Sequence, residues 1–433
     1  MRFYNKCWGQ AREPDPNMVI KRLSIERKSF KLKVPLPKTE RKSPMLKQDY
    51  TAEILDLEDI EVTKVEKMES GLHFYIQLPV RPHVCPLCGQ HTSTVHDYRE
   101  QVIKDIPFGR DTYIHLRKRR YSCPHCRKRF YEQNTFLARY HRTTTRLVAA
   151  VITAFRKLQP AKEVAAQYNI SSTTALRYFD HVKYSPTKLP EVLSIDEFKG
   201  NAGGEKYQCI ITDAKNKKLV DILPNRFEAD LIRYFRRFSD RDAVKFFVTD
   251  MNPHFRAVAQ TCFPNATIIA DRYHVIRQVV WAMENVRKEE QKHLSGRFRK
   301  YFKRSRALLN KPLKKLTEQD MNRLTLMFEI APRLADAYRL KNYFLLVMHS
   351  HPDDAPKLLA DWLLLAERYG FREFNACISA YHNWSKEILN AIRFPWSNGF
   401  TEGCNNKTKV LKRVSFGVSN FERFRNRILH CAS

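Results

Sequence analysis

Apolar residues recur along this chain with two periods, one typical of strands and the other typical of helices. Between residues 54 and 78 they alternate with polar residues in short runs such as Ile60–Val65, which predicts short strands. Residues 145–183 show helical spacing instead, and strand-like apolar runs return between Val192 and Asp271. A long, basic, helical stretch follows. The pattern predicts a multidomain α+β protein.

The second group of strand-like runs has an order that carries information about the fold. We expect five strands and two helices, in the order β-β-β-α-β-α-β: strands 192–198, 207–212, 218–223, 244–249 and 266–270, with helices at about 226–239 and after Pro253. This order is that of the ribonuclease H-like fold. There, an acid in the first strand lies beside an acid that ends the fourth, so Asp196 and Asp250 should converge.

Composition narrows the class of protein. The chain has 433 residues, with 77 Lys and Arg against 46 Asp and Glu, a net charge of +31. This excess favours a polyanionic partner, above all nucleic acid, over the alternative of a merely solvated basic surface. Glycine is scarce, at 12 residues, and no phosphate-cradling or dinucleotide motif occurs. An ATP- or NAD-driven enzyme therefore has no motif support.

The sequence also bears on location. No apolar run reaches the roughly 18 residues that a membrane span needs, and the first twenty residues lack the apolar centre of a secretory signal. We therefore expect a cytoplasmic protein, associated with the nucleoid when it binds DNA. Residues 1–44 hold 12 basic and 4 acidic residues without sustained periodicity. They are interpreted either as a disordered basic arm or as sequence upstream of a mis-called start, with Met45 as the true one.

Four cysteines form a metal-binding pattern. Cys85 and Cys88 make one C-x-x-C turn, and Cys123 and Cys126 make a second one, separated from the first by 34 residues. Two such turns supply the four soft ligands of a tetrahedral zinc site, whereas a thioredoxin-like role would need only one turn. The second turn lies among Lys and Arg residues. We therefore predict a zinc-ribbon-like domain whose structural Zn²⁺ stiffens a basic, DNA-facing surface.

Residues 160–182 have the pattern of a helix-turn-helix. Val164, Ala165 and Tyr168 form one apolar face, Asn169–Ser171 the turn, and Ser171 or Ser172 the N-cap of the second helix. Side chains that face outward from that helix are expected to contact DNA; they are Ser172, Thr173, Thr174 and Arg177. An ordinary helical hairpin is the alternative.

A third acid follows a turn near the C-terminal end. Ser397–Gly399 predicts a turn, and a helix should begin just after it. On that helix Glu402, Asn406, Lys409 and Arg413 fall on one face. A carboxylate followed by a basic stripe suits a metal site with a DNA phosphate running along the helix. For any single acid, surface charge is the alternative explanation.

These residues together resemble bacterial insertion-sequence transposases of the DDE type, specifically the ISL-three group, from about Leu55 to Ile428. The most specific matches are Leu193–Phe198, Val248–Met251, Ala270–Val275 and Ser397–Asn406. The resemblance implies that Asp196, Asp250 and Glu402 form the metal-binding triad. Three carboxylates suit two Mg²⁺ ions, with Mn²⁺ as a substitute, and such a site can cleave and then join DNA.

The resemblance also implies partners and an organisation. The partners are double-stranded DNA of the element's ends and of the target, with the protein acting as a homo-oligomer on DNA. Predicted domains are short strands at 45–82, zinc binding at 83–130, a helix-turn-helix at 145–184, a ribonuclease H-like core at 190–275 and 396–433, and a helical insertion at 276–395. Two competing hypotheses remain: a DNA-binding regulator without catalysis, and a ribonuclease H-like nuclease or resolvase.

Overall fold

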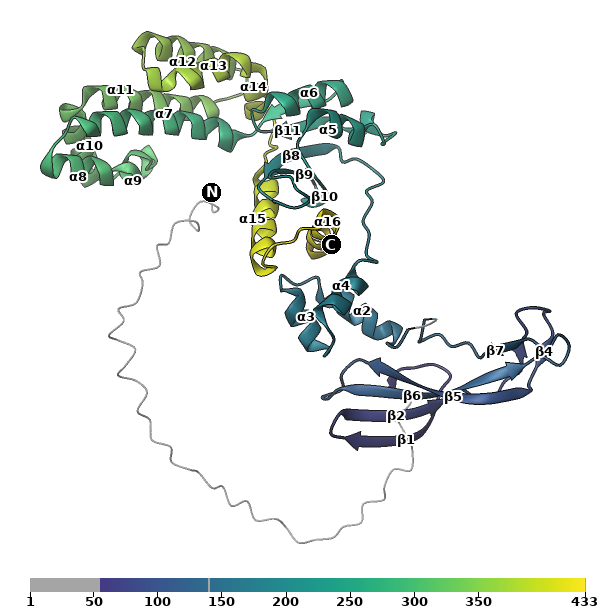
Figure 1. Ribbon diagram of the computed structural model, residues 1–433. Coiled ribbons are helices and arrows are strands. Elements are labelled where there is room, and N and C mark those ends of the chain that lie inside the picture. The colour runs from purple at the N-terminus through teal and green to yellow at the C-terminus, as the bar shows by residue number, and fades with distance from the viewer. Residues whose placement is uncertain (1–54, 139–140, 433) are drawn as a thin grey trace, which may run out of the picture. The chain divides into compact units, whose positions relative to one another are not determined.

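The computed structural model describes residues 55–138 and 141–432 (Figure 1). The predicted segment 1–44 and its alternative start at Met45 lie outside the described residues. Leu55–Ser433 forms one compact unit by its internal contacts. In the part of the chain that is described, no helix is both long and apolar enough to cross a membrane.

An N-terminal sheet carries the two cysteine turns. Its strand order is β1-β2-β6-β5, with β7 added on β6. The strands are β1 (Glu61–Met68), β2 (Gly71–Gln77), β5 (Val95–Asp105), β6 (Thr112–Ser122) and β7 (Arg129–Tyr131), and the short pair β3 (His83–Val84) and β4 (His91–Thr92) stands apart. Because β2 pairs in parallel with β6, strands from both sides of residue 83 share one sheet. The structure thus joins what the sequence pattern separates into 45–82 and 83–130.

Three short helices follow: α2 (Thr145–Ala154), α3 (Ala161–Gln167) and α4 (Ser172–Phe179). They pack around Leu147, Val164, Ala175 and Phe179, each fully buried. Asn169 in the turn between α3 and α4 has a φ of 46°, a left-handed conformation that Asn tolerates better than most residues. The predicted apolar faces of this helix-turn-helix are the ones that are buried.

The central sheet has the strand order β10-β9-β8-β11-β12. Its strands are β8 (Val192–Phe198), β9 (Gln208–Asp213), β10 (Lys218–Leu223), β11 (Phe246–Thr249) and β12 (Thr267–Ala270). The first three pair antiparallel, and β8, β11 and β12 run parallel. All five strands lie where the apolar runs predict them, within two residues at each end.

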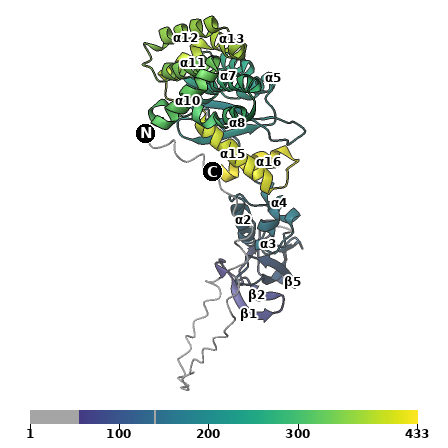
Figure 2. The same ribbon diagram turned by 90° about the vertical axis from the view of Figure 1, so that its left-hand side faces the viewer.

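Helices cover both faces of this sheet. One face packs against α5 (Glu228–Phe235) and α6 (Pro253–Cys262), and the other against α15 (Gly399–Val414) and α16 (Phe421–Ala432). Side chains alternate along a strand, so Leu193 and Ile195 of β8 join the α5–α6 core, while Phe198 joins the α15–α16 core. Asp196 lies two residues before Phe198 and therefore points to the same face of the sheet. That face receives α15, which lies against the sheet in Figures 1 and 2.

Between β12 and α15 the chain forms a helical region with its own core. Its helices are α7 (Arg272–Lys292), α8 (Gly296–Arg304), α9 (Arg306–Leu309), α10 (Glu318–Ile330), α11 (Pro332–Met348), α12 (Ala355–Tyr369), α13 (Asn375–Asn383) and α14 (Ser385–Arg393), and 3-10 turns occur at Arg241–Ala243, Leu313–Lys315 and Arg372–Phe374. Phe344, Trp362 and Tyr381 pack ring against ring at its centre. The Asn390 side chain of α14 donates to the Ile268 carbonyl of β12 at 2.8 Å. The end of the helical region therefore lies beside the central sheet.

The last helix, α16, contacts both the central sheet and the helix-turn-helix. Arg423 forms a paired hydrogen bond with the Asp180 carboxylate, at 2.7 Å for each contact. The buried Arg427 guanidinium lies 4.3 Å from the ring centre of Phe155 and donates to the Gln159 carbonyl at 3.0 Å. Cation–π contact and hydrogen bonding together compensate for the burial of this charge.

Candidate active site, zinc cluster and DNA-reading helix

Asp196 and Asp250 lie side by side at corresponding positions of two neighbouring parallel strands. In the register of β8 and β11, Ser194 lies opposite Val248. Two residues further along each chain stand Asp196 and Asp250, on the same side of the sheet because side chains alternate. The sheet thus brings together two acids that lie 54 residues apart in the sequence.

The electrostatic environment of this pair disfavours two negative charges. Burial, with the nearby charge of Asp250 as a further cause, raises the pKa of Asp196 to about 7. Burial also raises the pKa of Asp250, while His274, whose Nδ1 lies 4.0 Å from Asp250 Oδ2, opposes that shift. In the part of the chain that the structure describes, neither carboxylate forms an ion pair with Lys or Arg. A bound cation would therefore be strongly favoured here.

Asn405 of α15 orients Asp196. Its amide Nδ2 donates to Asp196 Oδ2 at 2.8 Å, and the backbone N–H of Glu197 donates to the other oxygen at the same distance. Asn405 is buried, and its own Oδ1 has no hydrogen-bond partner. A buried acceptor without a donor is rare in native structures. Together with the two acids it offers hard oxygen ligands, the type that Mg²⁺ prefers.

Glu402 lies on the same helix as Asn405. It is exposed in the first turn of α15, three residues before Asn405. Among the described residues, the four cysteines are the group of three or more His, Cys, Asp or Glu side chains that could hold a metal ion. The structure therefore does not gather Asp196, Asp250 and Glu402 into such a group.

A buried polar network fixes α15 on the sheet. The Ser194 hydroxyl donates to Asn398 Oδ1, and the Thr401 hydroxyl lies 2.7 Å from the hydroxyls of both Ser194 and Thr212. Asp271 accepts from the backbone N–H of Asn398 at 2.9 Å and also caps α7. All five side chains are buried. Asp271 thus has a positioning role, since it ties the start of α7 to the start of α15.

Sequence reasoning missed Asn405 and this network. One signal was present, because Ser194 and Thr212 are polar residues inside apolar strands whose neighbours are all buried. Polar side chains in such positions need partners. Their partners come from a segment about 200 residues away, and no local pattern identifies which segment that is.

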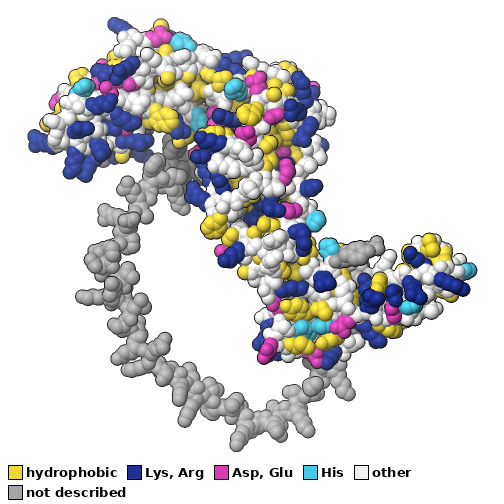
Figure 3. Space-filling view, viewed as in Figure 1, with side chains coloured by type: hydrophobic (Ala, Val, Ile, Leu, Met, Phe, Trp, Pro, Cys, Tyr) yellow, Lys and Arg dark blue, Asp and Glu magenta, His cyan; other side chains and the backbone are white. Residues whose placement is uncertain are grey.

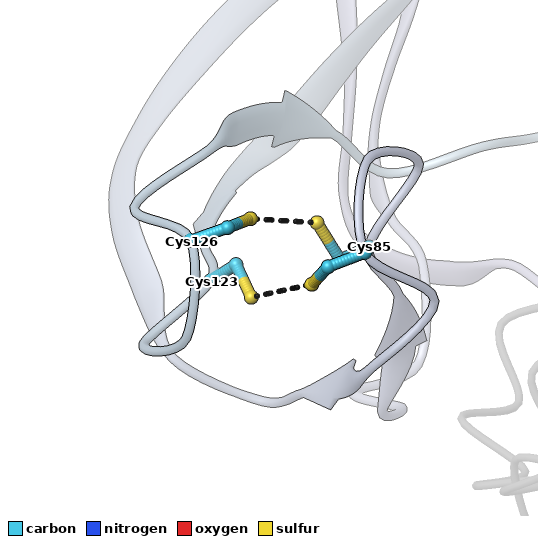
Figure 4. Close-up of side chains that lie close together, drawn as sticks. Cys85, Cys123 and Cys126 are labelled. Atoms are coloured by element: carbon cyan, nitrogen blue, oxygen red, sulfur yellow. Dashed lines mark hydrogen bonds between the residues drawn. The ribbon is translucent and has the colours of Figure 1, made fainter.

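The four cysteines converge as their spacing predicts. The Sγ atoms of Cys85 and Cys126 lie 3.5 Å apart, as do those of Cys88 and Cys123 (Figure 4), and all four sulfurs lie within 4.8 Å of one another. The backbone N–H of Cys126 lowers the pKa of Cys123, although burial opposes this shift. A thiolate is the form that binds a metal. The sulfur set and its turns fit a structural Zn²⁺.

The second helix of the helix-turn-helix begins as predicted. Ser171, one of the two N-cap candidates, is the N-cap, and its side chain accepts from the backbone N–H of Thr174 at 3.1 Å. Thr173 and Arg177 are exposed, whereas Ser172 and Thr174 are partly buried. On α15, the four residues predicted to share a face are all exposed: Glu402, Asn406, Lys409 and Arg413.

Comparisons with known proteins match three segments of the chain. The model of the ISL3 transposase family, described as a transposase, matches residues 193–428. A zinc-finger of transposase IS204/IS1001/IS1096/IS1165 matches residues 81–126, and a helix-turn-helix domain of transposase family ISL3 matches residues 132–182. The transposase for insertion sequence element IS1001 from Bordetella parapertussis is 25% identical over 370 residues, which is 82% of this chain and 89% of that protein. The predicted zinc finger and helix-turn-helix are confirmed.

We expect the purified protein to carry about one zinc per chain, because four thiolates held in two preformed turns bind Zn²⁺ tightly. Cys123→Ser should lower the zinc content well below one, as measured by elemental analysis. Cys431→Ser is the matched control, since this thiol lies outside the cluster. Full zinc content in Cys123→Ser would contradict the assignment.

Asn398→Ala should loosen α15. It removes the buried hydrogen bonds that the Asn398 side chain forms with the Ser194 hydroxyl and the Ile195 carbonyl, which should lower the free energy of opening of α15 by about 1–3 kcal/mol. Hydrogen exchange of the α15 amides measures this quantity. Asn406→Ala, on the exposed face of the same helix, should change it by less than about 0.5 kcal/mol. Equal protection in both variants would show that the network does not hold the helix.

Proposed function

This chain belongs to the ISL3 family of transposases, and we propose that Asp196, Asp250 and Glu402 are the acids of its DDE catalytic site. As a transposase it is an enzyme that acts on DNA with DDE-type catalysis. The proposal concerns which residues perform that chemistry and how the chain presents them to DNA.

The placement of Asp196 and Asp250 is the main support for the proposal. Asp196 and Asp250 stand level on adjacent parallel strands, on the face that receives α15. Both have raised pKa values because of burial, and neither pairs with Lys or Arg among residues 55–138 and 141–432. A pair of acids needed only for stability would gain by pairing with a cation of the protein. The described chain instead places only neutral donors on the Asp196 oxygens.

The architecture supports the same proposal. The order β10-β9-β8-β11-β12, three antiparallel strands followed by two parallel ones, is the order expected for a ribonuclease H-like core. In this view residues 190–275 and 396–433 form the core, and 276–395 form a helical insertion with its own apolar centre. The insertion separates the third acid from the first two in the sequence, while α15 returns it to the same face of the sheet.

The donor set fits Mg²⁺, with Mn²⁺ as a substitute. Asp196, Asp250 and Glu402 would supply carboxylate oxygens, and the unpartnered oxygen of Asn405 faces the same region. When bound, such ions stabilise the attacking and leaving oxygens of an in-line displacement at phosphorus. The chain's own residues hold the site ready, since Asn405 and the backbone N–H of Glu197 fix both oxygens of Asp196.

Glu402 completes the proposed triad by a movement of its side chain. It is exposed, and its carboxylate has no hydrogen-bond or ion-pair partner in the described part of the chain. It lies three residues before Asn405, which contacts Asp196 directly. A free carboxylate on the first turn of a fixed helix can rotate toward a cation at modest entropic cost.

The rest of the chain supplies DNA contacts. Thr173 and Arg177 of the recognition helix, together with the partly buried Ser172 and Thr174, would contact bases and phosphates of the element's ends. On α15, Asn406, Lys409 and Arg413 extend from Glu402 along one exposed face, where a phosphate backbone can follow them. We propose that the protein acts as a homo-oligomer, since an element has two ends and each chain has one such site.

Two other functions are less well supported. A DNA-binding regulator would account for the zinc finger and helix-turn-helix, but not for a transposase match over residues 193–428. A nuclease limited to cleavage would share the carboxylate site but would not account for similarity to a transposase over 82% of this chain.

Arg177 should contribute to recognition of the ends. Arg177→Ala should weaken binding to end DNA by about 1–3 kcal/mol if the guanidinium reads a guanine. Arg177→Lys keeps the charge but loses the paired hydrogen bonds, so it should retain the salt dependence while losing preference for the end sequence. Gel shifts at defined salt with end and scrambled DNA measure both effects. Wild-type affinity in Arg177→Ala would rule out this residue as a reader.

Asp196→Asn, Asp250→Asn and Glu402→Gln should each reduce cleavage and joining by orders of magnitude, because the remaining acids cannot replace a lost ligand. Binding to end DNA should persist, or rise slightly in metal-free buffer, since each change removes a negative charge that faces phosphate. Strand transfer of labelled end DNA with Mg²⁺, run beside a gel shift, measures both.

Glu191→Gln is the matched control for these variants. It removes a carboxylate just before β8, where Glu191 pairs with Lys215 and Lys245 on the protein surface, and it should leave joining nearly unchanged. Wild-type joining in Glu402→Gln would exclude Glu402 as the third ligand, and wild-type joining in all three acid variants would overturn the proposed site.

A further inference from the structure

The positive charge of the helical region is concentrated in one short segment. Residues 296–315 contain nine Lys or Arg and no Asp or Glu. Residues 316–395, which form most of the remaining helical region, contain nine basic and ten acidic residues. A general preference for a basic surface would spread the charge evenly. This distribution instead marks one segment of the region for contact with a polyanion.

Most basic residues of this segment have no acidic partner among the described residues; Lys311, which pairs with Asp320, is the exception. Elsewhere in the helical region some exposed cations do pair with acids, for example Arg333 with Glu373 and Arg339 with Asp336. Within the described ranges, the exposed cations at the start of the segment have no ion pair. We call these residues the 297–306 basic face. They are Arg297, Arg299, Lys300, Lys303, Arg304 and Arg306.

These residues lie together because of the helix that carries them. On α8, Phe302 is fully buried and anchors one side of the helix to the core. Lys300 falls opposite Phe302, and Arg299 and Lys303 lie on the flank between, so that the three are within about a third of a turn of one another at 3.6 residues per turn. Figure 3 shows Lys and Arg side chains crowded over the end of the helical region where Figure 1 labels α8 and α9.

Helix α7 sets the distance between this face and the carboxylates. It begins directly after Asp271, whose charge is close enough to affect both Asp196 and Asp250. Its 21 residues span about 31 Å at 1.5 Å per residue. A straight duplex of about nine base pairs has the same length, at 3.4 Å per pair. This step, unlike the charge argument, rests on the proposed catalytic site.

The exposed side of α7 would not repel a duplex along this path. Its most exposed side chains include Tyr273, Arg277, Trp281 and Lys288, and none of them is acidic. Arg277 lies over the Trp281 ring at 3.9 Å from its centre. An arginine held against an aromatic ring is pre-oriented and keeps its charge available for a phosphate.

We propose that the 297–306 basic face binds the phosphate backbone of the target duplex, about nine base pairs from the point of joining. The face offers charge but no exposed Asn, Gln, Ser or Thr to read base edges. It therefore suits a duplex whose sequence is not fixed. The end DNA, by contrast, has a fixed sequence, and the helix-turn-helix is the module that reads it.

The test compares two triple variants that remove equal charge. Arg299→Gln/Lys300→Gln/Lys303→Gln alters the face, and Arg339→Gln/Lys357→Gln/Arg368→Gln removes three exposed cations of α11 and α12. Pre-cleaved end DNA is joined to plasmid target at several salt concentrations. We expect the target concentration for half-maximal joining to rise about tenfold or more in the first variant only. The salt slope of target binding should fall by about 0.9 for each lost phosphate contact.

The outcomes separate this proposal from its alternatives. Equal losses in both variants would show an effect of net charge alone and overturn the proposal. A parallel loss of end binding in a gel shift, or a loss only with uncut flanking DNA, would assign the face to donor DNA and overturn it too. Unchanged target use would show that the face contacts no DNA. If the first variant unfolds, Arg297→Gln/Arg304→Gln/Arg306→Gln serves in its place.

A separate measurement distinguishes this proposal from failure of the catalytic assignment. Binding of plasmid target to Asp196→Asn protein requires no chemistry, so the basic face can be tested there even when joining is absent. Asp196→Asn should bind target like the wild type, and the same protein with the three α8 substitutions should not. If Asp196→Asn still joins DNA while the α8 variant loses target binding, the carboxylate assignment fails and the basic face stands.

Discussion

A buried set of hydrogen bonds joins two parts of the core that lie about 200 residues apart. Ser194 in β8 and Asn398 before α15 are 204 residues apart, and Thr401 extends the contact to Thr212 in β9. Each group would be costly to bury alone, so the cluster is favourable only when every member is present. The position of α15, and with it Asn405 beside Asp196, depends on this cluster.

The helical region between β12 and α15 is compatible with such a contact because it has a core of its own. The entropy of closing a loop grows only with the logarithm of its length, but a flexible loop would not position α15. Here the intervening helices pack around Phe344 and Trp362. Both ends of the region lie at the same strand, with α7 starting directly after β12 and Asn390 of α14 bonded to Ile268. A packed region anchored at both ends can therefore position α15.

The sequence predicts what is local and misses what is not. Apolar runs identify β8 and β10 to the residue, and C-x-x-C spacing identifies the four cysteines that converge, because both signals lie in short segments. The parallel pairing of β2 with β6 and the partner of Ser194 depend on contacts between distant segments, which leave no local pattern. The motif and helix face predict Glu402 as the third acid. Its exposure on α15 agrees with the predicted face, but among the described residues the three acids do not form a group that could hold a metal ion.

A strongly basic enzyme with an acidic site must keep its own cations away from that site. A Lys or Arg beside Asp196 and Asp250 would lower their raised pKa values, but it would also occupy the position of a metal ion. The structure avoids this by using a neutral group for orientation, since Asn405 holds Asp196 by an amide hydrogen bond. The guanidinium of Arg226, whose charge acts on Asp250, is held by Glu197. Basic charge on the surface and the acidic pair can therefore coexist, because the side chain that contacts Asp196 is neutral.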